Sequence, residues 1–482
     1  MSTQQPNFLI IMSDEHAPMY SSIHGHPLVQ TPQMERLAAM GTTFDVAYCN
    51  SPLCMPSRMS FMTGRYIHHT GSWDNAAPLE SDTVTWAHLL RSTGYDVAIS
   101  GKQHFCGPDQ LHGFQTQLAR DLHAERAHPI FSWDDGIRTA PRPWQGIDEA
   151  GPGTTEEIEV DDLVQARALE YLHDPARQQR PWALNVGFIA PHFPLVVPQR
   201  FWDLYPLDQI DLPDLPPGHL DNLHPVYQRM RTMFGLIDFP EDGVRRARAG
   251  YYALITYLDE KIGQLIDALE ATGQLENTVI IHTSDHGEMN GEHGMWRKSN
   301  FYEAASRIPL QIAWPGHLPT GKRIPQVVSL VDLVATVVDM AGAAPVTPLD
   351  GDSLLPLLKD KADDWKDEAF AEYLAHGVDR PMAMLRSGRY KLNYSLNDPL
   401  ELYDVVADPN EFTNLAENPD YADVLEALKT RLLSHWNPEA IDRAVRQSQR
   451  ERLLIERATD SAWRGLSHAV PPPEWQGRQS SP

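Results

Sequence analysis

The stretch from Cys54 to Arg65, CMPSRMSFMTGR, contains the side chains with the clearest capacity for chemistry. Its pattern predicts a helix that begins near the cysteine, with Arg58 one turn further along. A helix N-terminus and a nearby guanidinium both favour negative charge, so we expect an anion beside residue 54. The alternative is that Cys54 is a small buried apolar residue before a proline-initiated helix. Other motifs in the sequence have to decide between these two interpretations.

Two acidic motifs end predicted buried strands elsewhere in the chain. Asp14 closes the run IIMSD at 10–14, and Asp285 and His286 follow the run 278–283. Because the carboxyl ends of parallel strands meet at one edge of a sheet, we expect these three side chains to converge with residue 54 as metal ligands. Taken singly, Asp14 could be a helix cap, and the Asp-His-Gly string could be an ordinary turn.

Lysine and histidine side chains that could contact an anion lie in three further motifs. Lys102 and His104 follow the predicted strand 96–100, where Gly101 allows a close approach of the backbone. His192 lies in the string Pro-His-Phe-Pro at 191–194, and Lys298 lies in the string GMWRK at 294–298. A lone lysine or histidine is usually structural. Together, these groups can balance the charge of a bound oxyanion.

In this order along the chain, the motifs resemble those of the sulfatases of the alkaline-phosphatase superfamily. Residues 54–58 match the Cys-x-Pro-x-Arg core at which cysteine is oxidised to formylglycine, and residues 402–415 resemble the family's C-terminal subdomain. The resemblance covers roughly residues 7–436. It implies formylglycine at position 54, a formylglycine-generating enzyme as partner, and one Ca²⁺ or Mn²⁺ ion. The implied metal ligands are Asp14, Cys54 in its hydrated aldehyde form, Asp285 and His286.

The expected chemistry explains why a cysteine would be modified. A serine that attacked sulfur would leave a stable alkyl sulfate, whereas a geminal diol can collapse to an aldehyde and expel sulfate by C–O cleavage. We therefore expect one hydroxyl of hydrated formylglycine 54 to attack the sulfur of a sulfate ester in line. The expected supporting roles are charge balance by Arg58, Lys102 and Lys298, general acid catalysis by His192 with help from Lys298, and general base catalysis by His104.

Within the family, the Asp-His pair and the strings at 49–54, 74–77 and 101–114 resemble the choline-sulfatase and phosphonate monoester hydrolase branch. In that branch Asn75 would contact the anionic group of the substrate. Glu15 stands where the branch usually has an amide, which predicts an altered metal identity or affinity. The stretch 372–381 contains no clear acidic and aromatic box for a quaternary ammonium group, so choline sulfate is expected to be a poor substrate.

Three rival functions use some of the same residues. A phosphonate monoester or phosphodiester hydrolase would use all of them, and the sequence does not separate it from a sulfatase. A two-zinc phosphatase would need a second Asp/His ligand set and a serine or threonine in place of Cys54. A binding protein without activity would be expected to lose some of the cationic residues, which are all present. Adjacent His68 and His69 cannot face one centre on a helix and are expected to be structural.

Composition limits the classes of function further. The 482 residues are 42% hydrophobic and 22% charged, which is typical of a large globular protein. The formal net charge of −25 argues against nucleic acid and anionic membranes as partners. The N-terminus lacks a signal-peptide pattern, and the apolar stretch 324–344 is predicted to be an amphipathic helix rather than a membrane span. We expect a cytoplasmic protein without a disulfide framework, in which Cys49 and Cys106 are buried thiols.

Short apolar runs alternate with longer segments of helical periodicity, which predicts an α/β fold with a mostly parallel sheet flanked by helices. The predicted elements of this part are strands at 7–12, 96–100, 182–188 and 278–283 and helices at 32–40, 85–92, 160–172 and 244–271. Strands at 382–386, 390–394 and 400–404, followed by a helix at 421–436, predict a small C-terminal α+β subdomain.

The predicted organisation is a catalytic domain at 1–364, an α+β subdomain at 365–440 and a tail at 441–482. Trp463 and Trp475 lie in an otherwise polar part of the tail and are expected to dock on the body or on a partner subunit, which predicts a homo-oligomer such as a dimer or tetramer. The proline-rich segment 194–217 is expected to be a surface excursion or lid that shapes the leaving-group pocket together with the tail.

Overall fold

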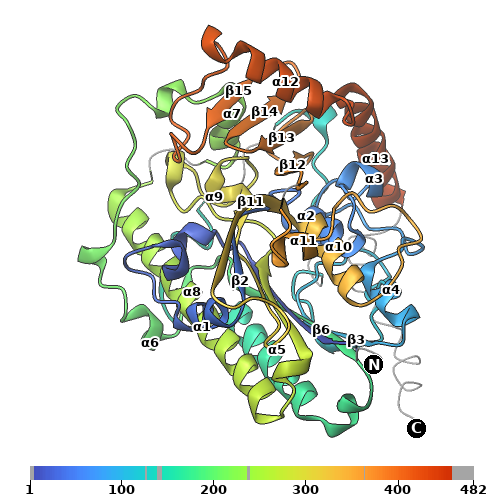
Figure 1. The fold of residues 1–482 in the computed structure, drawn as a ribbon. Helices are drawn as coiled ribbons and strands as arrows, with labels where there is room; N and C mark the ends of the chain where they lie inside the picture. The colour runs from blue at the N-terminus through green and yellow to red at the C-terminus, as the bar shows by residue number, and fades with distance from the viewer. Residues whose placement is uncertain (1–4, 125–127, 138–143, 236–238, 363, 459–482) are drawn as a thin grey trace.

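A computed structural model describes residues 5–124, 128–137, 144–235, 239–362 and 364–458. Within these residues, nine strands form a central sheet with the order β11-β2-β10-β8-β1-β6-β3-β4, and β9 pairs with β2 (Figure 1). The strands are β1 (Asn7–Asp14), β2 (Thr42–Tyr48), β3 (Asp96–Gly101), β4 (Thr116–Ala119), β6 (Trp182–Pro191), β8 (Thr278–Ser284), β9 (Arg307–Ile308), β10 (Leu310–Ala313) and β11 (Lys322–Ser329).

Helices cover both faces of this sheet, so its central strands are buried throughout. Alternate residues of β1 enter different cores: Leu9 and Ile11 pack on one face, and Phe8 and Ile10 on the other. The first face is covered by α1 (Pro32–Met40), α5 (Glu156–His173) and α8 (Glu241–Ala271), and the second by α2 (Cys54–Thr63), α4 (Trp86–Ser92) and α10 (Leu330–Met340) (Figure 1).

Shorter elements join these layers. Two short strands, β5 and β7, pair in parallel. The bounds are β5 (Gly151–Pro152), β7 (Val196–Val197), α3 (Ile67–Thr70), α6 (Gln199–Trp202), α7 (Pro225–Met233), α9 (Glu303–Ser306) and α11 (Leu355–Leu358). The segment predicted to be an excursion, 194–217, contains β7, α6 and a short 3-10 helix at Leu207–Gln209, joined by irregular backbone.

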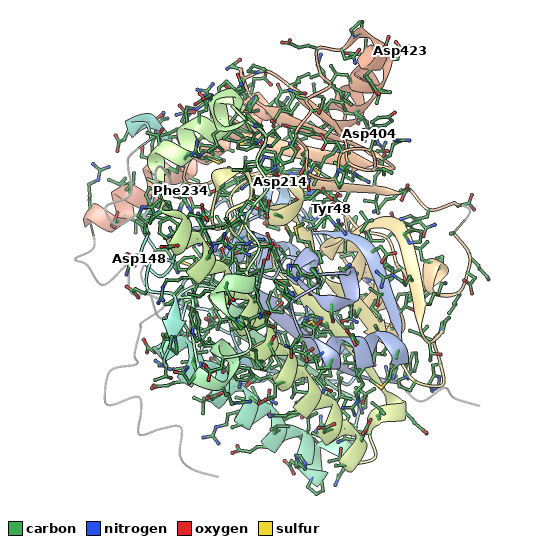
Figure 2. The ribbon with its side chains drawn as sticks, turned by 90° about the vertical axis from the view of Figure 1, so that its left-hand side faces the viewer. Tyr48, Asp148, Asp214, Phe234, Asp404 and Asp423 are labelled. Atoms are coloured by element: carbon green, nitrogen blue, oxygen red, sulfur yellow. The ribbon has the colours of Figure 1, made fainter. Side chains whose placement is uncertain are left out.

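A second sheet, antiparallel and of four strands, lies at one end of the molecule. Asp404 and Asp423 mark this end in Figure 2, and Tyr48 marks the end of β2 below it. The elements here are β12 (Glu368–Tyr373), β13 (Met382–Ser387), β14 (Tyr390–Ser395), β15 (Glu401–Asp404), α12 (Ala422–Leu433) and α13 (Pro438–Ala458).

The predicted α/β architecture with a small C-terminal α+β part is confirmed, as are the four predicted central strands and the helices between them. The prediction of one helix over 324–344 is wrong. Residues up to Ser329 form β11, which pairs with β2, and the helix begins only after Ser329. A capping box explains this boundary, because the Asp332 carboxylate accepts a hydrogen bond from the Ser329 N–H at 2.8 Å.

Two further predictions concern a membrane span and the C-terminal tail. No helix among the described residues is long and apolar enough to cross a membrane. The predicted docking of Trp463 and Trp475 lies outside the described residues.

Candidate active site and metal centre

Four neighbouring parallel strands end at the candidate site. Asp14 is the last residue of β1, Lys102 follows β3, His192 follows β6, and Asp285 follows β8. These strands lie side by side in the order β8-β1-β6-β3 and run in the same direction, so their carboxyl ends share one edge. The sheet therefore gathers side chains from positions that are far apart in the sequence.

Two glycines allow the ends of β3 and β6 to approach each other. Gly101 has a φ of +85°, and a Cβ placed there would collide with the carbonyl of Gly187. A Cβ at Gly187 would in turn collide with the carbonyl of Lys102. The Lys102 N–H donates to the Gly187 carbonyl at 2.8 Å. The absence of side chains at these two positions is what places Lys102 at the strand edge.

The four predicted metal ligands lie together. The ligand atoms of Asp14, Cys54, Asp285 and His286 are within 4.8 Å of one another, and all four residues are buried. His286 Nε2 lies 3.2 Å from Cys54 Sγ, 3.6 Å from Asp14 Oδ1 and 3.7 Å from Asp285 Oδ1. Asp14 Oδ1 is buried without a hydrogen-bond partner among the described residues. A buried carboxylate oxygen that lacks a donor, beside other oxygen and imidazole ligands, fits a divalent cation.

Helix α2 begins at Cys54 and carries Arg58 into the base of the site. Arg58 Nε donates to Asp285 Oδ2 at 2.8 Å, and its NH1 and NH2 groups donate to the carbonyls of Lys102 and Ser13 at 2.8 and 3.3 Å. The guanidinium therefore connects the ends of β8, β3 and β1, and both Arg58 and Asp285 are fully buried. At the helix N-terminus, the Asn75 side-chain oxygen accepts a hydrogen bond from the Met55 N–H at 3.1 Å.

Glu15 lies between two predicted catalytic residues. Its carboxyl oxygens are 3.0 Å from Lys298 Nζ and 3.2 Å from His192 Nε2. Burial raises the pKa of Glu15 to about 8, although Lys298 opposes the shift. The short contact of 2.5 Å to the Phe193 carbonyl places the proton of neutral His192 on Nδ1, which leaves Nε2 facing the Glu15 carboxyl group. The sequence identified Glu15 as a departure but did not indicate these partners.

The charges of the site are balanced among its own residues. Burial alone would raise the pKa of Asp14, but the Lys102 ammonium, which forms an ion pair with its Oδ2, holds that pKa well below its ordinary value. Burial and the nearby Asp14 raise the pKa of the Cys54 thiol to about 12. Burial, together with Lys298, holds the pKa of His192 well below its usual range. The positive charge of Lys102 is therefore already balanced by Asp14 before any anion binds.

His104, two residues after Lys102, lies in a group of histidines. Its Nε2 is 2.9 Å from His128 Nε2, and its ring lies 5.5 Å from that of His123. The backbone of His104 has a φ of +63°, a strained value that the Asp121 carboxylate supports by accepting the N–H groups of residues 103 and 104. No sequence motif pointed to His123 or His128, because their spacing acquires meaning only in the folded chain.

The C-terminal helix α13 reaches the loop that carries Asn75. Arg452 NH1 and NH2 donate to the two carboxylate oxygens of Asp74 at 2.8 Å each, and both side chains are nearly buried. Gln449 of the same helix accepts a hydrogen bond from the Trp133 N–H at 2.9 Å. The predicted substrate-binding Asn75 is thus positioned next to a residue that is fixed by the end of the described chain.

We expect the Asp74–Arg452 pair to make stability sensitive to acid. Burial would raise the pKa of Asp74, but Arg452 outweighs this and lowers it. Since the folded pKa is the lower one, the stabilisation is complete above about pH 4 and is lost as the pH falls through the folded pKa. In calorimetry at neutral pH, Arg452→Met should cost about 3–5 kcal/mol by leaving a buried unpaired carboxylate.

The deficit of Arg452→Met should shrink as the pH falls, first through the pKa of the unpaired Asp74 in the variant, which burial raises, and then through the lower folded pKa of Asp74 in the wild type. Arg450→Met is the control, because Arg450 is on the same helix but exposed and paired with Asp134. A deficit of equal size at pH 3 and pH 7 would contradict the assignment of the effect to this ion pair.

Comparison with known proteins accounts for this arrangement. Residues 6–343 match the family model described as Sulfatase, and residues 291–437 match that of the N-sulphoglucosamine sulphohydrolase C-terminal region. The chain belongs to the sulfatase family. The choline-sulfatase of Rhizobium meliloti (strain 1021) is 39% identical to this sulfatase over 95% of this chain and 92% of its own length. The arylsulfatase K of Danio rerio is 29% identical over 94% of this chain and 88% of its own length.

Solved structures of related enzymes have the same fold. The phosphonate monoester hydrolase of Agrobacterium radiobacter superposes with a TM-score of 0.75 at 26% identity, covering 89% of this sulfatase and 95% of that chain. The corresponding enzyme of Silicibacter pomeroyi gives a TM-score of 0.74 at 26% identity, with the same coverage of both chains. The fold is therefore that of the alkaline-phosphatase superfamily, and the protein is a sulfuric ester hydrolase.

Proposed function

We propose that this sulfatase hydrolyses aryl or alkyl sulfate esters with a hydrated formylglycine, made from Cys54, as its nucleophile. The observation that supports this proposal best is the buried cluster of Asp14, Cys54, Asp285 and His286, whose ligand atoms lie within 4.8 Å of one another. These four residues would hold one Ca²⁺ or Mn²⁺ ion. When bound, the cation supplies Lewis-acid stabilisation of negative charge on the transferring group.

The electrostatics of Cys54 support its modification. Burial raises the pKa of the thiol to about 12, so an unmodified Cys54 would remain protonated and would be a poor nucleophile near neutral pH. Oxidation by a formylglycine-generating enzyme would replace the thiol with an aldehyde, and hydration of the aldehyde gives two hydroxyl groups. One hydroxyl attacks sulfur, and loss of the proton from the other drives release of sulfate.

Two side chains can supply the proton that the leaving alcohol needs. Burial lowers the pKa of Lys298, but Cys54, Glu15 and Asp14 together outweigh it and raise the pKa; Asp14 is the one of these that is ionised at neutral pH, where Lys298 is protonated. His192 is neutral, because burial and Lys298 lower its pKa. The proton therefore comes from Lys298 directly; His192 can supply one only once its Nδ1–H leaves the Phe193 carbonyl. Lys102 and Arg58 balance the charge, and Asn75 is the proposed contact to the anionic group of the substrate.

The residues near position 376 favour neutral rather than quaternary ammonium leaving groups. Both carboxylate oxygens of Glu372 are occupied, by His68 Nδ1 at 2.8 Å and by Trp436 Nε1 at 2.9 Å. Asp379 is paired with Arg380 at 2.8 Å. These carboxylates are therefore engaged with protein groups, and we propose that choline sulfate is a poor substrate despite the similarity to a choline-sulfatase.

Phosphonate monoester hydrolysis is the second candidate function. It is favoured by the structural similarity to phosphonate monoester hydrolases and by the close geometry of the two anions. A two-zinc phosphatase is less compatible. Asp14, His123 and His192 do form a second group with ligand spacing, but the Lys102 ammonium pairs with Asp14, and Cys54 occupies the place of a serine or threonine.

Mass spectrometry and a substrate panel test the proposal. The tryptic peptide that contains residue 54 should have the mass of an aldehyde in place of the thiol. Turnover of 4-nitrophenyl sulfate should exceed that of choline sulfate by at least about tenfold in kcat/KM, a barrier difference of about 1.4 kcal/mol. An unmodified peptide in active enzyme would refute the formylglycine nucleophile. Faster hydrolysis of a phenyl phosphonate monoester would make the second candidate the main activity.

A further inference from the structure

The candidate base His104 is buried, and one of its nitrogens is free. His104 is 1% exposed, and its Nδ1 has no hydrogen-bond partner among the described residues. Burial and the neighbouring His128 hold the pKa of His104 well below its usual range, so the ring is neutral and can accept a proton. A proton accepted at a site closed to solvent needs a path outward before the next cycle can begin.

His128 offers that path. Its Nε2 lies 2.9 Å from His104 Nε2 and 3.1 Å from the carbonyl of His123, and its side chain is only partly buried. Two imidazole nitrogens bound to one tetrahedral zinc at 2.0–2.1 Å are separated by about 3.4 Å. The shorter distance between the two rings therefore indicates a hydrogen bond rather than a shared ion.

We propose that His104 and His128 form a proton relay that serves the second half of the sulfatase reaction; this inference rests on the proposed function. His104 Nδ1 takes the proton of the second diol hydroxyl as the aldehyde forms and sulfate leaves. His104 then passes its Nε2 proton to His128 Nε2, and His128 releases a proton from Nδ1 to solvent. Each ring gains one proton and loses one, so both rings end neutral with exchanged tautomers. When water adds to the aldehyde to form the diol again, His104 Nδ1–H gives its proton to the aldehyde oxygen, the His128 Nε2 proton moves back to His104 Nε2, and His128 Nδ1 takes a proton from solvent, which restores the starting tautomers.

The surroundings of His128 stabilise the transferred proton on its ring. Burial lowers the pKa of His128, but the His123 carbonyl acts in the opposite direction. Once Nε2 of His128 is protonated, that carbonyl can accept its hydrogen. In contrast, among the described residues His104 Nε2 has His128 as its only hydrogen-bond partner. The proton is thus favoured on the outer ring, from which solvent can remove it.

The test separates the two half-reactions of the wild-type enzyme and of His128→Gln. Glutamine can keep a hydrogen bond to His104 but cannot pass on a proton. With 4-nitrophenyl sulfate, we expect steady-state kcat to fall by about tenfold or more, whereas the first equivalent of 4-nitrophenol appears at the wild-type rate. Quenched His128→Gln enzyme should carry one sulfate on the peptide with residue 54, as measured by mass spectrometry. His317→Gln, at an exposed histidine, is the control.

A second variant distinguishes loss of proton transfer from loss of the folded structure. His128→Ala should regain turnover on addition of imidazole, and no such gain is expected for His128→Gln, in which the glutamine side chain occupies the space. Unchanged kcat in His128→Gln, or equal loss of the burst and the steady state without imidazole rescue of His128→Ala, would overturn the relay. Absence of wild-type turnover on every sulfate and phosphonate ester would instead refute the proposed function, and the relay with it.

Discussion

Cys54→Ala should have no detectable turnover, and Cys54→Ser should keep less than about a tenth of the wild-type rate, because neither side chain can form a geminal diol. A serine could attack once, but its sulfate ester would then have to be cleaved by a second attack on a crowded anion. The measurement is kcat/KM with 4-nitrophenyl sulfate. Retention of more than about a tenth of the rate, a barrier change below about 1.4 kcal/mol, would eliminate the formylglycine mechanism.

The control for this series is Cys106→Ser. Cys106 is also a free thiol that does not belong to the ligand cluster; the prediction that it is buried is wrong, because it is only partly buried. We expect this variant to keep wild-type kinetics. Circular dichroism and the melting temperature of all three variants distinguish loss of chemistry from loss of fold, and a parallel loss of activity in Cys106→Ser would remove the special role of position 54.

Asp285→Asn should reduce metal occupancy and lower activity by about two orders of magnitude or more. Asp285 belongs to the candidate metal cluster; its Oδ1 accepts from the N–H groups of Glu15 and His286 at 3.2 and 2.9 Å, and its Oδ2 accepts from Arg58 Nε at 2.8 Å. Replacing one carboxylate oxygen by an amide removes a negative ligand and weakens the hold on the guanidinium. Metal analysis of the dialysed protein and kcat/KM at saturating Mn²⁺ and Ca²⁺ measure the two effects separately.

The matched control for Asp285 is another buried aspartate. Asp259 of α8 accepts hydrogen bonds from the N–H groups of Gln33 and Met34 at the start of α1, at 3.0 and 2.8 Å. Asp259→Asn should change stability without changing metal occupancy. If Asp285→Asn bound as much metal as the wild type, Asp285 would have to be removed from the ligand set.

The strand ends were predictable because their sequence pattern is local. A continuous apolar run followed at once by Asp14, or by Asp285 and His286, indicates both a buried strand and a polar residue at its end. The start of α2 at Cys54 was predictable for the same reason. The boundary between strand and helix inside 324–344 was not predictable, because an apolar stretch does not show where strand pairing stops and a helix begins. The Ser329–Asp332 capping box that sets this boundary is a short signal.

The remaining features of the site depend on contacts between distant positions. Asp74 and Arg452 are separated by 378 residues, and Glu15 and Lys298 come from different loops. His128 becomes meaningful only because the chain brings its ring beside that of His104. Local periodicity does not predict such pairs, and a single sequence does not show which distant residues come into contact in the folded chain. Sequence motifs could therefore identify the candidate ligands, but not the side chains that orient them or exchange protons with them.

The ion pair between α13 and the Asn75 loop has a consequence for the order of events during synthesis. Cys54 is 2% exposed in the folded chain, so an enzyme that oxidises it needs the unfolded or partly folded protein. Arg452 is among the last described residues to be made, and until it pairs with Asp74 the loop beside Cys54 lacks its final support. A ribosome adding about 5–20 residues per second leaves some tens of seconds between the two positions. The proposed modification of Cys54 would therefore have to occur before the chain folds around that residue.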